Sequence, residues 1–267
     1  MSNKQIPQGD LGSFQTFMDI VETLHAPGGC PWDREQTHES LKRTLLEECY
    51  EVLEAIDQGD PQSLSEELGD LLLQVGFHAV IAREAGEFSL TDVLTHINEK
   101  LIRRHPHVFS DGTASDAQEV EANWEQLKAT ERAQEGGRRS PVEGIPSELP
   151  ALTYAQLMQD RVGRAGFEWE DISGVLDKVA EEVEELRRAV TEEEKVHELG
   201  DLMFTMVNLS RWMNIHAEDA LRQAKRRFQG RYLQMEELAD RRGQDFNGLP
   251  LMEKESLWQE AKGLEDG

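Results

Sequence analysis

An internal repeat constrains the fold of this chain more than any other feature of its sequence. Residues 48–51 and 67–70 each span a pair of acidic residues one helical turn apart, and residues 182–185 and 198–201 carry the same pairs in the same order. A basic segment and a Trp-Lys pair follow each set, again in matching order. Self-similarity over so long a period indicates two copies of one supersecondary unit. We therefore predict two duplicated domains in tandem.

Both copies have the residue pattern of helices. They are rich in Glu, Leu, Ala, Arg and Gln, with apolar residues spaced as on one helical face, and β-branched alternation is scarce. Residues 136–150, GGRRSPVEGIPSELP, are crowded with glycine and proline, which interrupt helices. We predict an all-α chain with an N-terminal domain at residues 1–138, a linker at 139–150 and a C-terminal domain at 151–267.

Charge and composition exclude several classes of protein. The 53 acidic and 28 basic residues give a net charge of −25, which argues against nucleic-acid binding. No apolar run reaches the roughly 18 residues of a bilayer span, and the first residues lack the apolar core of a signal peptide. We therefore expect a cytoplasmic protein with no membrane partner. Two cysteines, Cys30 and Cys49, are too few for a disulfide framework.

The acidic pairs of the first copy border apolar helical faces. At 100° per residue, the apolar residues of 45–56 form one arc with two glutamates at its edge, and those of 64–75 form a second arc with Glu and Asp at the matching edge. Residues 59–61, Gly-Asp-Pro, break the chain between the helices, and Ser63 with Glu66 predicts a capping box that begins the second helix. Packing the arcs together brings four carboxylates to one rim: Glu48, Glu51, Glu67 and Asp70.

Four carboxylates at a half-buried rim favour a bound cation. They repel one another, and desolvation raises their pKa values unless a cation neutralises them. Oxygen-only ligands suit Mg²⁺ or Mn²⁺, whereas zinc normally takes His or Cys ligands. The alternative is that glutamate-rich helices simply carry solvated charge, which is the better reading of any single glutamate. The duplicated pattern favours metal binding. The second rim is formed by Glu182, Glu185, Glu198 and Asp201.

Basic and aromatic residues supply candidate substrate contacts. A local cation cluster would hold a triphosphate despite the net negative charge, and arginine offers a planar fork to phosphate oxygens. The alternative is that these residues pair with acids near helix ends. The basic candidates are Lys100, Arg103, Arg104, His105 and His107 in the first copy, and Lys225, Arg226, Arg227 and Arg231 in the second.

Two tryptophans lie four residues before a lysine at matching places in the copies. Trp124 precedes Lys128, and Trp258 precedes Lys262. Each tryptophan could stack on a nucleobase while the lysine reaches a phosphate, although core packing is the common role of a single tryptophan. The matched positions make the two interpretations comparable.

A family resemblance rests on the acidic signatures and the segment before the first of them. The signatures are Glu47-Glu48-x-x-Glu51 with Glu67-x-x-Asp70, and Glu181-Glu182-x-x-Glu185 with Glu198-x-x-Asp201. Residues 30–38, CPWDREQTH, resemble the opening motif of longer, two-domain MazG proteins, and the linker GIPSELPAL belongs to the same likeness. The chain thus resembles the MazG family of all-α nucleoside triphosphate pyrophosphohydrolases over most of its length.

The resemblance implies a fold, a reaction and a ligand set. It implies four-helix-type domains that bind Mg²⁺, with Mn²⁺ as a substitute, convert NTP or dNTP to NMP and pyrophosphate, and form a homodimer. Trp32 of the opening motif is a candidate for substrate binding, and residues 166–169, Gly-Phe-Glu-Trp, stand in its place in the second copy. The metal ligands that it implies are Glu48, Glu51, Glu67, Asp70, Glu182, Glu185, Glu198 and Asp201.

The expected chemistry is attack of water on the α-phosphorus, with pyrophosphate leaving. A glutamate beside the metal ligands accepts the proton of the water, and basic residues neutralise the leaving group. Two alternatives remain: one or both copies bind nucleotide or metal as a non-catalytic sensor or dimer-forming domain, or the chain is an acidic helical scaffold. The candidate catalytic residues are Glu47, Glu48, Glu181 and Glu182.

A homodimer is also expected from apolar residues beyond one stripe of each helix. Such residues predict a second buried face. They are Leu73, Val80, Phe204 and Val207.

Overall fold

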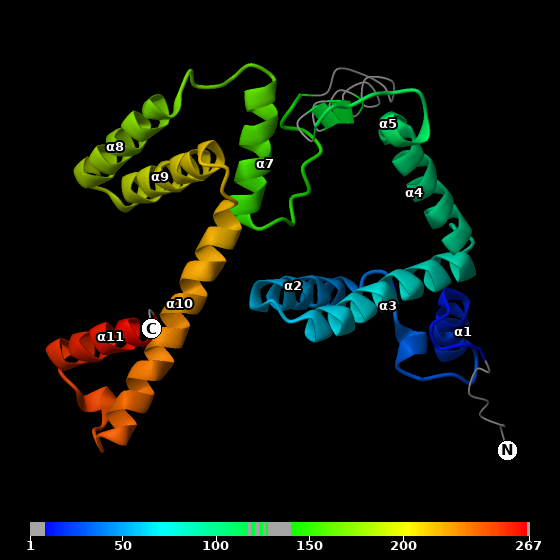
Figure 1. The fold of residues 1–267 in the computed structure, drawn as a ribbon, viewed down its shortest axis with the longest axis horizontal. Coiled ribbons are helices and arrows are strands. Elements are labelled where there is room, and N and C mark those ends of the chain that lie inside the picture. Colours follow the sequence, from blue (N-terminus) through cyan, green and yellow to red (C-terminus); the bar gives the residue numbers. More distant parts are fainter. Residues whose placement is uncertain (1–8, 117–118, 121–122, 125–126, 128–139, 266–267) are drawn as a thin grey trace. The chain divides into compact units, whose positions relative to one another are not determined.

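All regular secondary structure in the described part of the chain is helical. The computed structural model describes residues 9–116, 119–120, 123–124, 127 and 140–265. Within these ranges every regular element is a helix and none is a strand (Figure 1). The all-α prediction is confirmed. In the same ranges, no helix combines the length and apolar character needed to cross a lipid bilayer.

Tertiary contacts divide the chain into two units, Met1–Glu131 and Arg132–Gly267. The division falls shortly before the predicted linker at 139–150. The helices of the first unit are α1 (Phe14–His25), α2 (Lys42–Gln58), α3 (Pro61–Ala85), α4 (Leu90–Arg104) and α5 (Pro106–Phe109), with a 3₁₀ turn, η1 (Asp33–Glu35). Those of the second are α7 (Ala151–Arg164), α8 (Ile172–Arg188), α9 (Glu192–Trp212), α10 (Ala217–Arg241) and α11 (Leu251–Glu265), with a 3₁₀ turn, η2 (Phe246–Gly248).

Helices α2 and α3 form a hairpin whose turn differs from the predicted one. Gly59 ends α2 in the left-handed conformation, with φ of 66°. The Asp60 carboxylate then accepts hydrogen bonds from backbone N–H groups of the first turn of α3, with Pro61 as the first helical residue. The predicted capping box of Ser63 and Glu66 is therefore wrong. Proline needs no N–H partner at the first position, so Asp60 caps the helix one turn earlier.

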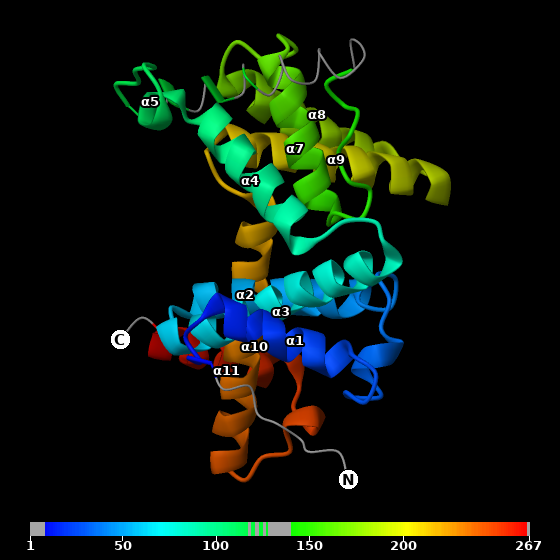
Figure 2. The same cartoon turned by 90° about the vertical axis from the view of Figure 1, so that its right-hand side faces the viewer.

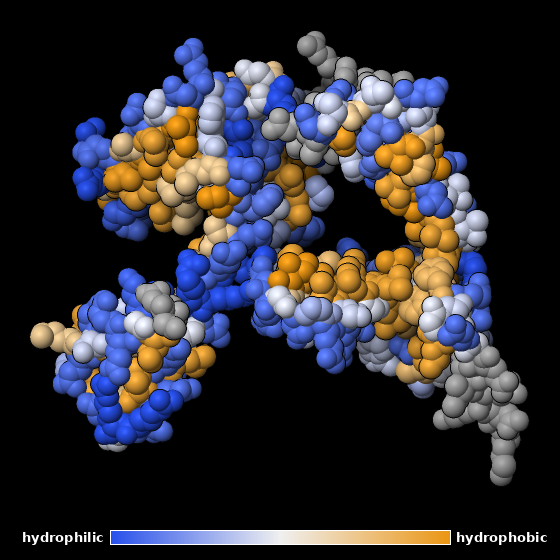
Figure 3. All heavy atoms as spheres, viewed as in Figure 1, coloured by the Kyte–Doolittle hydropathy of each residue, from blue (hydrophilic) through white to orange (hydrophobic). Residues whose placement is uncertain are grey.

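The core of the first unit lies at one end of this hairpin. Helix α1 packs on α3, and buried side chains from α1, α3 and the start of α2 form one cluster: Met18, Val21, Leu41, Phe77 and Val80. Burying each of these large side chains contributes roughly 1.5–3 kcal/mol. Outside this cluster, the apolar arcs of α2 and α3 stay partly exposed, as the orange surface in Figure 3 shows. The exposed side chains there are Leu46, Ile56, Leu68, Leu72 and Val75.

The second unit repeats the hairpin with a different turn. Helices α8 and α9 pack against each other, and Thr191 begins α9 through a capping box with Glu194. Helix α7 packs on α9, while α11 packs on α10 around a separate core of Met235, Ala239, Phe246, Leu257 and Ala261. Figures 1 and 2 show α11 against the far half of α10, away from α8 and α9. The side chains of this core come from α10, η2 and α11 and from none of the described residues of α8 and α9.

Two of the four residues expected on a second apolar face are instead core residues. Val80 and Val207 are each only 1% exposed. Leu73 is partly buried against the first core, and Phe204 is exposed. The error arose because helical phase places residues on a face but does not say which face the neighbouring helix covers.

A histidine pair near the first core makes stability depend on pH. The Nδ1 atoms of His38 and His78 lie 2.7 Å apart, and the rings stack with centroids separated by 5.0 Å. Glu87 lies 3.7 Å from Nε2 of His38. Burial, and then the charge of His38, hold the pKa of His78 below its usual value of 6.5. One ring must donate to the other, so a second proton is disfavoured.

We expect acidification to destabilise the protein through this pair. A histidine with a lowered folded-state pKa binds fewer protons than in the unfolded chain, so its stabilising contribution is present above pH 6.5 and is lost as the pH falls below it. His78→Asn should remove part of the acid-induced fall in melting temperature, by about 1–3 °C because the group is partly exposed. Thermal melts across this range test it, with exposed His96→Asn as control. An identical acid profile for both variants would contradict the assignment.

Candidate metal centre

The first carboxylate cluster lies across the α2–α3 hairpin. Glu48 and Glu51 on α2 and Glu67 on α3 each place an oxygen so that the three atoms lie within 4.8 Å of one another. Asp70, one turn along α3, is close enough for its charge to raise the pKa of both Glu48 and Glu67. The structure thus brings together three of the four carboxylates predicted from the sequence, with Asp70 near enough to act on two of them through its charge.

These carboxylates repel one another. Burial raises the pKa of Glu48, and the charges of Asp70, Glu51 and Glu67 raise it further. Burial likewise raises the pKa of Glu67, followed by the charges of Glu51 and Asp70. A site whose members resist ionisation is stabilised by a proton or a cation. The donor set is all oxygen, which fits Mg²⁺ or Mn²⁺.

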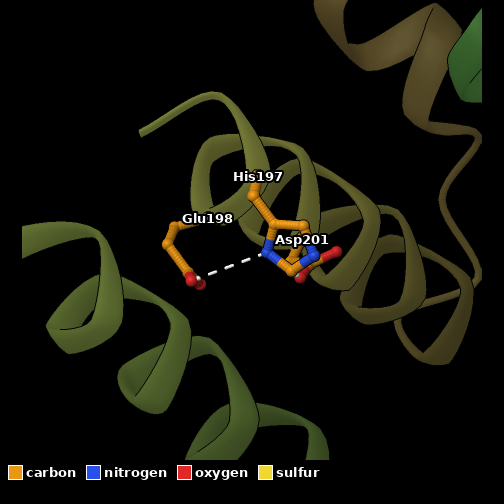
Figure 4. Close-up of side chains that lie close together, drawn as sticks. All are labelled: His197, Glu198 and Asp201. Carbon is orange, nitrogen blue, oxygen red and sulfur yellow. Dashed lines mark ion pairs between the residues drawn. The ribbon is translucent and has the colours of Figure 1, made fainter. Parts of the chain in front are cut away.

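The second cluster lies across the α8–α9 hairpin in the same arrangement. Glu182 and Glu185 on α8 and Glu198 on α9 place one oxygen each within 4.8 Å of one another. Glu198 also belongs to a group on α9 in which Nδ1 of His197 lies 3.5 Å from Glu198 and 3.3 Å from Asp201. Figure 4 shows this imidazole ring beside both carboxylates. Glu198 belongs to both groups, and it therefore connects Asp201 with Glu182 and Glu185 in the second predicted set.

Glu182 provides the clearest sign that the second cluster fits a cation. Its residue is 3% exposed, and its Oε2 atom is buried without a hydrogen-bond partner. Its other oxygen, Oε1, lies 2.8 Å from Nζ of Lys178. An unpaired buried carboxylate oxygen is costly, and an ion beside it would remove that cost.

Two residues of the second cluster were missed from the sequence. Lys178 contacts both Glu181 and Glu182, and these hydrogen bonds raise its pKa. His197 contacts the two acidic residues of α9. The Lys178–Glu182 spacing of one helical turn was a signal that could have found the ion pair.

The two further catalytic candidates lie outside the groups of converging oxygens. Arg43 donates from Nε to Glu47 Oε1 at 2.9 Å, and Glu47 is 52% exposed. Lys178 donates to Glu181 Oε1 at 2.9 Å, and Glu181 is 57% exposed. Glu47 and Glu181 therefore both keep a largely solvated carboxylate, and each is next in sequence to a buried or half-buried member of a cluster.

The predicted basic residues lie on other helices than the carboxylates. Lys100, Arg103 and Arg104 are on α4, and His105 and His107 flank or belong to α5. The corresponding residues of the second unit, Lys225, Arg226, Arg227 and Arg231, are all on α10.

The predicted aromatic residues have varied surroundings. The guanidinium of Arg231 lies 5.5 Å from the ring centroid of Trp258, which also packs against Phe228. Trp124 meets His105 edge to face. Trp32 is 61% exposed, Lys262 is on α11, and Lys128 lies outside the described residues. In the second unit, the structure thus places Arg231, a predicted phosphate-binding residue, against Trp258, a predicted stacking residue.

An apolar pocket beside the second hairpin was only partly anticipated. It encloses about 430 Å³ between α7, residues 166–169 and α9. Arg211 lies 2.5 Å from Glu168 at its wall, and Nε1–H of Trp212 donates to the same carboxylate. Although burial opposes ionisation, these bonds hold the pKa of Glu168 below its usual range. The aromatic side chains that line the pocket are Phe167, Trp169 and Phe204.

The fold and the clusters define a class: tandem all-α units, each with three glutamates and an aspartate on a helical hairpin. Residues 36–109 match the family model of the MazG nucleotide pyrophosphohydrolase domain. Residues 153–228 match that of phosphoribosyl-ATP pyrophosphohydrolase.

Full-length relatives show the family. The chain is 46% identical over 250 residues to a Thermotoga maritima protein named nucleoside triphosphate pyrophosphohydrolase/pyrophosphatase MazG, covering 94% of this chain and 96% of the relative. It is 42% identical over 261 residues to the Escherichia coli K12 nucleoside triphosphate pyrophosphohydrolase, covering 96% and 99%. The chain belongs to the MazG family of nucleotide pyrophosphohydrolases. The resemblance inferred from the sequence, and with it the enzyme class, is confirmed.

Proposed function

We propose that this chain hydrolyses nucleoside triphosphates to nucleoside monophosphates and pyrophosphate at its carboxylate clusters, with Mg²⁺ as cofactor and Mn²⁺ as a substitute. The observation that carries the proposal is the convergence of three carboxylate oxygens within 4.8 Å in each hairpin. The names of the two full-length relatives support the same reaction.

The proposed ligands are the eight carboxylates of the two hairpins. Glu48, Glu51, Glu67 and Asp70 would hold the ion of the first site, and Glu182, Glu185, Glu198 and Asp201 that of the second. When bound, the divalent cation neutralises phosphate charge and lowers the pKa of water. The buried oxygen of Glu182 and the mutual repulsion around Glu48 are the features of this chain that fit it.

The chain's own residues would move the proton and hold the phosphates. Water oxygen attacks the α-phosphorus, the bond to the β-phosphate oxygen breaks, and its electron pair leaves with pyrophosphate. Glu47 or Glu181, solvated and next to a proposed ligand, accepts the proton of the water on a carboxylate oxygen. Arginine and lysine of α4 and α10 neutralise the leaving group. The proposed phosphate-binding residues are Lys100, Arg104, Lys128, Arg227, Arg231 and Lys262.

Product analysis tests the reaction directly. Purified protein is incubated with a panel of NTPs and dNTPs, with and without Mg²⁺, and the products are separated by ion-exchange chromatography. The proposal predicts equal amounts of monophosphate and pyrophosphate. Release of diphosphate and orthophosphate would mean attack at the γ-phosphorus, and tight nucleotide binding without turnover would favour a sensor.

We further propose a homodimer whose second copy covers the exposed faces of the hairpins. Apolar arcs remain open on α2 and α3, and α8 and α9 expose Leu176, Leu199, Met203 and Met206 in the same way. Contiguous apolar patches of this kind mark interaction sites. The basic residues of α4 and α10 lie on helices other than the hairpins, so assembly offers one route to complete the sites.

Light scattering tests the dimer. We expect a mass of twice 30.3 kDa, and Leu72→Glu, which places a charge in the centre of the exposed α3 face, should weaken association by about tenfold or more. Leu251→Glu, at an 81% exposed position on α11, serves as control. A monomer at all concentrations would contradict the proposal.

A further inference from the structure

The two carboxylate clusters differ in the cations that the chain itself supplies. In the second cluster, Nζ of Lys178 lies 2.8 Å from Oε1 of the buried Glu182 and 2.9 Å from Oε1 of Glu181. In the first cluster, the position one helical turn before Glu48 is Thr44, which carries no charge. The second site therefore holds an ammonium group against its most buried carboxylate. At the first site, the corresponding residue is a threonine and cannot supply a positive charge.

The residue just before the cluster glutamate of the second helix also differs, and it again makes the surroundings of the first cluster more negative. His197, which precedes Glu198, places Nδ1 within 3.5 Å of Glu198 and 3.3 Å of Asp201. At the matching position before Glu67, the first copy has Glu66, whose charge adds to the repulsion in that cluster. The two copies thus have the same carboxylates at matching positions, but the residues beside those carboxylates differ in charge.

We propose that Lys178 is an internal counter-ion of the second site, held on Glu182 until a divalent cation displaces it, so that the second site binds divalent cations more weakly than the first. An entering cation at the second site must break an ammonium–carboxylate contact at a buried oxygen and is repelled by the ammonium charge. At the first site, a cation relieves repulsion among carboxylates. The inference rests on the proposed role of both clusters as metal sites.

The structure also indicates where the ammonium group goes. Lys178 is 34% exposed and already contacts Glu181, which is 57% exposed. It can release Glu182 and keep Glu181 with little movement, so displacement does not strand a buried charge. Lys178 is therefore a residue that sets affinity by competing for Glu182.

Mn²⁺ binding measured by electron paramagnetic resonance tests this on the full chain, because the signal of unbound Mn²⁺ reports binding without turnover. The first site is silenced with Glu48→Gln and Glu51→Gln, and the second with Glu182→Gln and Glu185→Gln. In the chain with only its second site, Lys178 is replaced by Thr, the residue of the first copy. In the chain with only its first site, Thr44 is replaced by Lys.

We expect the two replacements to move affinity in opposite directions. Lys178→Thr should tighten Mn²⁺ binding at the second site by about tenfold, and Thr44→Lys should weaken it at the first site by a similar factor. The matched control is Lys195→Thr, which removes the same charge from the second unit but pairs with Glu192, 2.8 Å away, and not with Glu182.

Each outcome decides the inference. Unchanged affinity in Lys178→Thr, or an equal gain in Lys195→Thr, would overturn it while leaving both metal sites intact. If Lys178→Thr fails to fold because Glu182 has lost its partner, the Thr44→Lys result decides, and unchanged affinity there overturns the inference. Absence of Mn²⁺ binding in both single-site chains would overturn the metal sites of the proposed function as well.

Discussion

Replacing Glu67 and Glu198 together by glutamine should remove essentially all pyrophosphohydrolase activity, a fall of about a hundredfold or more. Each of these residues is the member of its three-oxygen group supplied by the second helix of the hairpin. Without it, the two remaining oxygens of that group come from a single helix, and Asp70 or Asp201 is the one proposed ligand left on the other helix. Glutamine keeps the size of the side chain but loses the negative charge, so the loss should appear in the rate and not in the fold.

The single variants distinguish two working sites from one. Independent sites should each lose part of the rate in Glu67→Gln and Glu198→Gln. If one single variant is inactive while the other is fully active, the silent copy is a binding or dimer-forming domain. The control is the double variant Glu54→Gln with Glu237→Gln, which should keep full activity. Both glutamates are exposed and lie outside the carboxylate clusters, where Glu54 accepts from Gln58 and Glu237 pairs with Arg241. Full activity of the Glu67→Gln, Glu198→Gln protein would contradict the proposed site.

Mg²⁺ should both switch on the activity and stabilise the fold. EDTA should abolish turnover, and Mg²⁺ at about a hundred times its Kd should raise the melting temperature by about 5–10 °C, because it binds the native clusters and not the unfolded chain. The burial and neighbouring charges that raise the pKa of Glu48 are the local source of that gain. Melting curves with KCl at matched ionic strength separate specific binding from screening.

Two results would count against this metal requirement. One is full turnover in rigorously metal-free buffer. The other is a melting temperature that responds equally to Mg²⁺ and to KCl, which would mean that the divalent cation only screens surface charge.

The hairpins show how far helical phase carries a prediction. The convergence of Glu48, Glu51 and Glu67 follows from their helical spacing and from the short turn that forces the two helices together. The start of α3 was misplaced because we predicted Ser63 as the cap, although Pro61 at the first helical position already favours a cap at Asp60.

Residues far apart in the chain were harder to place. Val80 and Val207 were expected on a second face buried by a partner copy but are buried within their own units, since helix phase does not identify the neighbour that covers a face. The basic residues of α4 and α10 recur in the right order, but recurrence says nothing about distance from the carboxylates. Arg231 and Trp258 meet because α10 and α11 pack together, which is a tertiary contact.

The sequence by itself determined the all-α class, the duplication, the two sets of acidic residues and the family, because these depend on local periodicity and on a repeat that can be read directly. Only the tertiary structure decided that Glu182 is buried and that its Oε2 atom has no hydrogen-bond partner. Burial depends on the helices packed around a side chain, whereas the contact of Glu182 with Lys178 lies within one helix. Glu48 and Glu182 therefore have the same place in the repeat and different electrostatic surroundings.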